Sequence, residues 1–100
     1  MEINSDTSIM EAISLYEHGV VPLLDDERYL SAVIGIGMVR DHLGSAWETM
    51  PLPSLKARIQ KVYYYLGIFK KHLDTGNSKV IQNGRERLED QLSILWHLTN

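Results

Sequence analysis

Residues 54–73 read SLKARIQKVYYYLGIFKKHL and contain the clearest periodic pattern in the chain. Apolar side chains recur there at alternating spacings of four and three residues, as in a helix that packs lengthwise in a bundle. These side chains are Leu55, Ile59, Val62, Leu66, Phe69 and Leu73. Ser54 is a candidate N-cap, and Asp74-Thr75-Gly76-Asn77 is a candidate turn. The stretch predicts a helix over residues 54–73 whose apolar side lies in a core.

Before this stretch, the sequence predicts two helices. Ser8 and Glu11 form a capping-box pattern that opens a helix over residues 9–18. Gly19 is the expected end of that helix, and Pro22 breaks the chain after it. The acids at positions 25–27 favour the positive end of a second helix, predicted over residues 25–43 and ended by Gly44.

After the stretch, a fourth helix is predicted to begin between residues 79 and 85 and to run to 97, because Asn83-Gly84 interrupts its pattern. No strand alternation has a partner elsewhere in the chain. We therefore expect an all-α, single-domain bundle of about four helices over residues 1–100, with residues 1–7 flexible.

Composition narrows the class of protein. The chain has 100 residues, 44% of them hydrophobic, and no cysteine, which excludes a disulfide scaffold and thiol chemistry. The first seven residues contain two acids and no apolar run, so no secretory signal is expected. The longest uncharged stretch, between Arg28 and Arg40, is about half the length that a membrane helix needs. A cytoplasmic protein without a membrane span is the default expectation.

Charge is distributed unevenly along the chain. Residues 1–50 contain nine acids and two bases, whereas residues 51–100 contain eight bases and four acids. Acidic and basic helices could lie side by side and neutralise each other. Alternatively, the basic half forms a nucleic-acid surface, with the tyrosines at 63–65 available for stacking. Its leading residues would be Lys61, Lys70, Lys71 and Arg85.

Neither a catalytic nor a metal motif is present. The four histidines fall near the expected C-terminal ends of helices, where the helix dipole favours them, and none has Glu-x-x-His or His-x-x-x-His spacing. Gly35-Ile36-Gly37 lacks the third glycine of a nucleotide fingerprint. We expect no catalytic residue, no metal and no cofactor. A helical-bundle enzyme or metal protein ranks third among the alternatives.

Two helices have more apolar surface than one core stripe requires. Leu30, Ile34 and Met38 lie away from the main stripe of the second helix. In the third helix, Tyr64 and Ile68 lie opposite the core seam together with Lys61 and Lys71, a mixture found at interaction hot spots. Another helix could instead cover them. These faces predict a noncatalytic protein-interaction module, such as a regulator, inhibitor, adaptor or chaperone-like protein, acting as a homodimer. The runner-up is a nucleic-acid-binding regulator.

Overall fold

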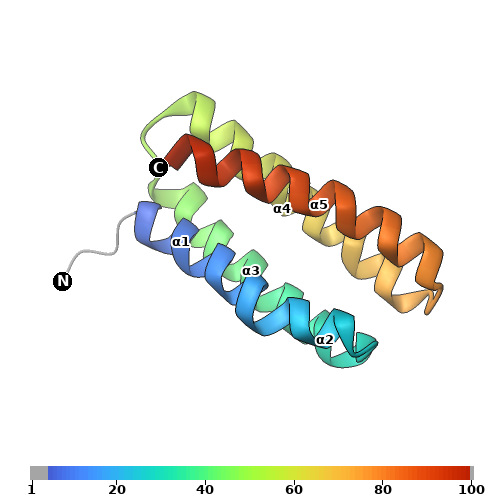
Figure 1. Ribbon diagram of the computed structural model, residues 1–100. Coiled ribbons are helices and arrows are strands. Elements are labelled where there is room, and N and C mark those ends of the chain that lie inside the picture. Colours follow the sequence, from blue (N-terminus) through green and yellow to red (C-terminus); the bar gives the residue numbers. More distant parts are fainter. Residues whose placement is uncertain (1–4, 100) are drawn as a thin grey trace.

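The protein is an all-α bundle, as the sequence predicts. The computed structural model describes residues 5–99, which form four helical rods and contain no strand (Figure 1). The first rod joins α1 (Ser5–Leu15), the π-helix η1 (Tyr16–Val20) and α2 (Val21–Asp25). The other rods are α3 (Tyr29–Thr49), α4 (Pro53–Asp74) and α5 (Ser78–Thr99). Residues 5–7 belong to α1, and the flexibility expected for residues 1–4 lies outside the described residues.

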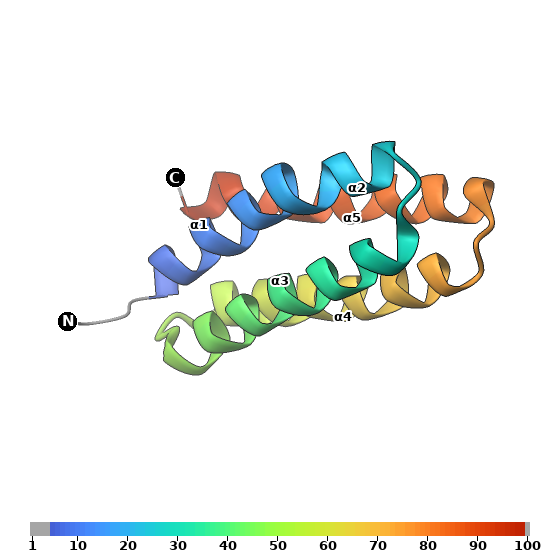
Figure 2. The same ribbon diagram turned by 90° about the horizontal axis from the view of Figure 1, so that it is seen from below.

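Consecutive rods run antiparallel (Figures 1 and 2). The α3 helix packs against α1 and α4, and α5 packs mainly against α4. The backbone of the first rod comes close to that of α5 only along α1. The first rod and α4 are therefore diagonal to each other in the bundle. Within the described residues, no helix is both long and apolar enough to cross a membrane.

The core confirms the pattern of residues 54–73. Five of the six periodic side chains of α4 are buried, and Phe69 is 1% exposed. Leu55, in the first turn, is partly buried against the same core. The helix begins at Pro53 with Leu52 as the N-cap residue, so the prediction that Ser54 caps it was wrong by two residues.

The first rod continues beyond its expected end. Gly19 and Pro22 do not end it, because the Val21 N–H donates to the Tyr16 carbonyl five residues earlier and opens a π turn. Pro22 then lies in the first turn of α2, where its missing N–H costs little. Ser8 is not a cap either: it is a buried residue inside the helix that begins at Ser5.

The acids at 25–27 end the first rod and do not open the second. The Glu27 N–H donates to the Leu24 carbonyl at 3.1 Å, and the Arg28 N–H donates to the Leu23 carbonyl at 2.8 Å. Glu27 has a φ of 58°, in the left-handed region. This is a Schellman C-cap with glutamate in the position that glycine usually occupies. Consequently α3 begins at Tyr29, four residues later than predicted.

The ends of α3 and α5 also differ from the prediction. The α3 helix passes Gly44 and ends at Thr49, because Ala46 and Met50 anchor its last part in the core. The turn at 74–77 is confirmed, and Gly76 has a positive φ of 64°. Asn77 caps α5 by accepting hydrogen bonds at its Oδ1 from the N–H groups of residues 79 and 80. The helix then runs without interruption through residues 83 and 84.

Candidate functional site

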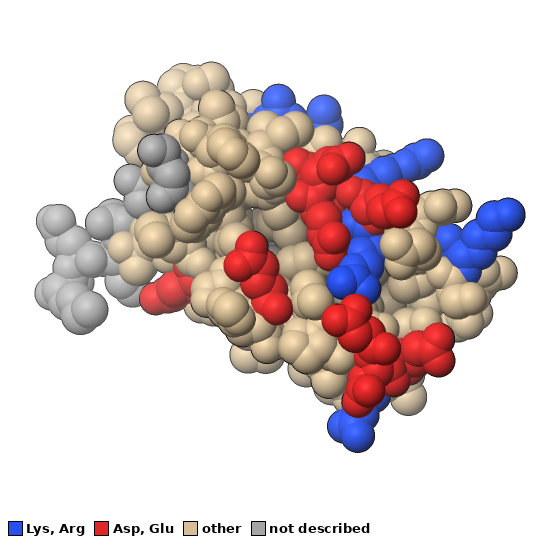
Figure 3. Space-filling view, in the orientation of Figure 1, with Lys and Arg blue, Asp and Glu red and all other residues tan. Residues whose placement is uncertain are grey.

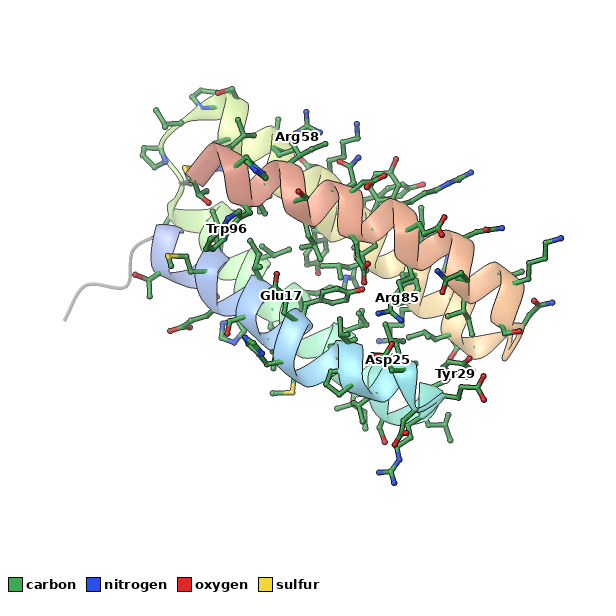
Figure 4. The ribbon with its side chains drawn as sticks, in the orientation of Figure 1. Glu17, Asp25, Tyr29, Arg58, Arg85 and Trp96 are labelled. Carbon is green, nitrogen blue, oxygen red and sulfur yellow. The ribbon has the colours of Figure 1, made fainter. Side chains whose placement is uncertain are left out.

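A groove with a volume of about 440 Å³ lies between the first rod and α5. Figure 4 shows Glu17, Arg85 and Trp96 along the space between these two rods. The first rod supplies the wall residues Ile13, Tyr16, Glu17 and Val21. The α5 helix supplies Arg85, Glu89, Leu92, Ser93 and Trp96. The groove is thus mainly apolar and has charged groups at defined places.

A hydrogen-bonded network crosses this groove. The Tyr16 hydroxyl donates to Glu89 Oε2 at 2.8 Å. Arg85 donates from Nε to the same oxygen at 2.9 Å and from a terminal nitrogen to Asp25 Oδ1 at 2.9 Å. The network connects α5 to the first rod at two points, one in η1 and one at the end of α2. It fixes the separation of the two walls where their backbones do not touch.

The network also affects the pKa values of Tyr16 and Arg85. Burial, reinforced by the hydrogen bond to Glu89, raises the pKa of Tyr16 well above its ordinary value. Partial burial disfavours the charge on Arg85, but its hydrogen bonds to Glu89 and Asp25 outweigh this and raise its pKa. Tyr16 is therefore a neutral donor and Arg85 a permanent cation in the groove.

The π-helix faces this groove. Tyr16 and Glu17, the first two residues of η1, both line it. Short π segments inside α-helices often occur at functional sites, since they shift the register of the side chains that follow. Tyr16, at the start of η1, donates to Glu89, and the buried Val20, at its end, packs into the core.

A second hollow of about 240 Å³ continues the groove toward the start of α5. It shares Arg85 with the first hollow and is also lined by Asp25, Glu27 and Tyr29. Arg85 is paired with Asp25, which lines the second hollow (Figure 4). The two hollows together follow one side of α5 from Ser78 to Trp96.

The face around the groove is acidic. Figure 3 shows acidic side chains gathered on this face around a small basic area. Residues 5–25 contain four acids and neither lysine nor arginine, whereas α4 contains five lysines and arginines and one acid. Because the first rod and α4 lie diagonally, these two helices do not neutralise each other directly. Within the described residues, the Arg85–Asp25 pair is the ion pair that links the two halves of the chain.

The candidate residues of α3 form one exposed row. Leu30, Ile34 and Met38 are 84%, 69% and 50% exposed. Their spacing of four places them on the side of α3 that faces away from the core. Gly37 lies beside this row, and nothing would be within 4 Å of a Cβ there.

The candidate residues of α4 form a separate surface. Tyr64 is 66% exposed, so no other helix covers it, while Ile68 is partly buried. Arg40 of α3 lies over the Tyr63 ring, with its Cζ 4.1 Å from the ring centroid. Tyr63 also lies beside Gly44 of α3, with its Cε2 4.0 Å from the position of a Cβ there, so Tyr64 is level with this part of α3 and beyond the end of the row at Met38. The exposed Lys61 and Lys71 are on the same helix as Tyr64, whereas the row of Leu30, Ile34 and Met38 is on α3.

The residues proposed for nucleic acid are divided between two surfaces. Lys61, Lys70 and Lys71 lie on α4, and none forms an ion pair with a described residue. Arg85 lies in the groove and is held by two carboxylates. Its side chain is committed to the network and is not part of the α4 surface.

The histidines match their expected positions in two of four cases. His72 and His97 lie in the last turns of α4 and α5, but His18 and His42 lie inside longer helices than the sequence predicts. His42 Nδ1 is 3.5 Å from Glu11 Oε2. Among residues 5–99, no three His, Asp or Glu side chains are grouped closely enough to hold a metal ion.

Comparisons with protein-family models, with curated proteins and with solved structures find no match to this chain. The arguments for function therefore depend on the groove, the α3 row and the charged surfaces.

Proposed function

We propose that this chain is a small noncatalytic protein-interaction module that acts in the cytoplasm as a homodimer. The regulator, inhibitor, adaptor and chaperone-like classes all use such a module. The observation that carries the proposal is the exposed row of Leu30, Ile34 and Met38 on α3. Three large apolar side chains on one helix face lose contact with water when a second helix covers them.

A second copy is a suitable cover for this row. In a two-fold dimer the same patch of both subunits meets, so an apolar row on one helix pairs with itself. Gly37, which has no side chain beside the row, allows the backbone of another α3 to approach closely. No charged residue interrupts residues 29–39.

Replacement of one residue in the row tests this proposal. Ile34→Asp should convert a dimer into a monomer in light scattering, with helicity in circular dichroism retained because the side chain is exposed. The matched control is Ser45→Asp, a change to the same residue at another exposed position of α3. A wild-type protein that is monomeric at high concentration, or a dimer that survives Ile34→Asp, would refute the dimer proposal.

A basic α4 favours nucleic-acid binding as the second candidate function. Lys61, Lys70 and Lys71 form no ion pair with a described residue. The acidic first rod is diagonal to their helix, α4. The negative net charge of the whole chain opposes such binding, and we expect it to be weak at physiological salt. A fluorescence anisotropy titration with DNA and RNA decides which of the two candidate functions ranks first. Tight binding with a steep salt dependence, lost on reversal of these three charges, would make nucleic acid the first candidate.

A further inference from the structure

The groove beside α5 is long enough for one short helix. Its α5 wall extends from Arg85 to Trp96. At about 1.5 Å per residue this wall is about 17 Å long, equal to roughly three turns of helix. Grooves between helices commonly bind amphipathic helices, which place one apolar face in the groove.

The walls offer apolar side chains for such a face. Ile13 and Val21 of the first rod and Leu92 and Trp96 of α5 line the groove, and Ile13 and Leu92 are each 5% exposed. Trp96 is an exposed large side chain, and aromatic residues contribute strongly to protein interfaces because they bury a large area with few rotatable bonds. The groove thus has apolar side chains in both walls, and Trp96 is the most exposed of them.

The charges specify which amphipathic helix fits. The cation of the groove, Arg85, already has two carboxylate partners. Glu17 lines the groove and forms no ion pair with a described residue. One turn of α5 before Glu89 lies Glu86, also acidic and exposed. An incoming cation would meet carboxylates, whereas an incoming anion would be repelled.

We propose that the groove between the first rod and α5 binds a cationic amphipathic helix of a partner protein. Apolar side chains of that helix contact Leu92 and Trp96, and its lysines or arginines pair with Glu17. This inference rests on the proposed function in one respect, that the chain is a protein-binding module. It uses a surface distinct from the α3 row, so the two interactions can be tested separately.

Designed peptides test the chemistry of the occupant. The probe is a fluorescein-labelled peptide of about 14 residues with leucines along one helical face and lysines elsewhere. One control peptide has the same composition in a shuffled order, and another carries glutamate in place of lysine. The first peptide should bind about tenfold or more tightly than either control in fluorescence anisotropy. Failure of the first peptide to bind, or equal binding of the shuffled peptide, overturns the proposal.

The two tryptophans of the chain locate the bound peptide. Trp96 is in the groove, whereas Trp47 lies on α3 beneath Lys56, whose Nζ is 4.1 Å from the ring centroid. In NMR spectra of 15N-labelled protein, the indole N–H of Trp96 should shift on addition of the peptide and that of Trp47 should not. Shifts of both signals, or of Trp47 alone, contradict a site in the groove.

Variants of the walls test the charge contribution. Glu17→Lys should weaken peptide binding about fivefold or more, whereas Glu48→Lys, the same charge change on an exposed residue of α3, should change it less than about twofold. Equal effects of both would mean that net charge alone is measured, which overturns the proposal. Trp96→Ala removes an apolar contact without changing charge. It should also weaken binding, and an unchanged affinity contradicts the docking mode.

Two further experiments distinguish this proposal from dimerisation through the α3 row and from binding of a second copy in the groove. The peptide should bind the Ile34→Asp variant as tightly as it binds the wild type, whether or not the wild type is a dimer. A second copy of this chain is the competing occupant, since α4 presents Lys61 beside the exposed Tyr64. Should Glu17→Lys and Lys61→Glu each reduce the molecular mass in the absence of peptide, the occupant is a second copy and the partner proposal is refuted.

Discussion

Gly84 of α5 lies against the imidazole of His72 on α4. A Cβ at position 84 would collide with the ring, with 3.1 Å to Cε1, and would also be 3.1 Å from Cδ1 of Phe69. The His72 Nδ1 is buried and has no hydrogen-bond partner within the described structure. The glycine therefore allows α4 and α5 to pack closely where a histidine projects between them.

We expect Gly84→Ala to destabilise the protein. Overpacking of a core costs about 1–3 kcal/mol, and the gain in helix propensity from glycine to alanine offsets about 1 kcal/mol of this. The net loss of unfolding free energy, up to about 2 kcal/mol, is measurable by urea denaturation. Introducing the same change into a His72→Ala background should cost less, because the ring is gone.

Gly37→Ala is expected to have the opposite sign. No atom would be within 4 Å of the new Cβ, so only the gain in helix propensity remains, about 0.5–1 kcal/mol. Urea denaturation measures this change in unfolding free energy. The Ile34→Asp variant is used as the background, because the dimer contact proposed for α3 is absent there. A loss of stability there would mean that α3 packs against something at this position that the bundle itself does not contain.

Replacement of Glu27 by glycine should stabilise the turn between the first rod and α3. A residue with a side chain is strained at a φ of 58°, and the left-handed conformation costs it about 1 kcal/mol. Glu27→Gly should therefore raise the unfolding free energy by about 0.5–1 kcal/mol. Glu27→Ala is the control, and it should bring no such gain because it keeps the Cβ. Equal gains from both would point to removal of the negative charge as the cause.

Phe69→Ala tests the core seam of α4. Phe69 is 1% exposed, and truncation of such a ring costs about 3–5 kcal/mol of unfolding free energy. Thermal melting should show a shift of many degrees. A shift of one or two degrees would contradict the packing of α4 described above.

The α4 helix was predictable because its periodic pattern lies within one continuous stretch of sequence. Leu66 and Phe69 belong to a repeat that one face of one helix satisfies, and the same residues lie in the core. The ends of the first rod were not predictable in this way. A π turn at Tyr16 accommodates Pro22, and Glu27 takes a position where sequence rules look for glycine.

The groove was missed for a different reason. Tyr16 and Glu89 are 73 residues apart, and their hydrogen bond depends on the separation of two rods, which has no local sequence signal. The acids Glu17 and Asp25 look like ordinary surface acids and helix caps in the sequence. By contrast, the exposure of Leu30 and Ile34 could be anticipated, since two apolar faces on one helix exceed what a single core stripe can bury.

The Tyr16 hydroxyl should make the stability of the bundle sensitive to alkaline pH. Burial and the hydrogen bond to Glu89 raise the pKa of Tyr16 above its ordinary value of 10.0 in the folded chain, whereas the unfolded chain loses the proton near that value. The folded state then holds a proton that the unfolded state has released. Stability is therefore complete below pH 10.0 and falls as the pH rises above it, by up to about 1.4 kcal/mol per pH unit.

Tyr16→Phe isolates this contribution. The variant should be less stable than the wild type at neutral pH, since Glu89 loses a hydrogen-bond donor, by about 1 kcal/mol. Above about pH 10 its unfolding free energy should fall less steeply than that of the wild type, so the two curves converge. Tyr64→Phe removes an exposed hydroxyl and should follow the wild-type curve. Urea denaturation at several pH values up to about 11.5 measures all three proteins. Parallel curves for wild type and Tyr16→Phe would mean that the Tyr16 hydroxyl is not held in the groove as the structure describes.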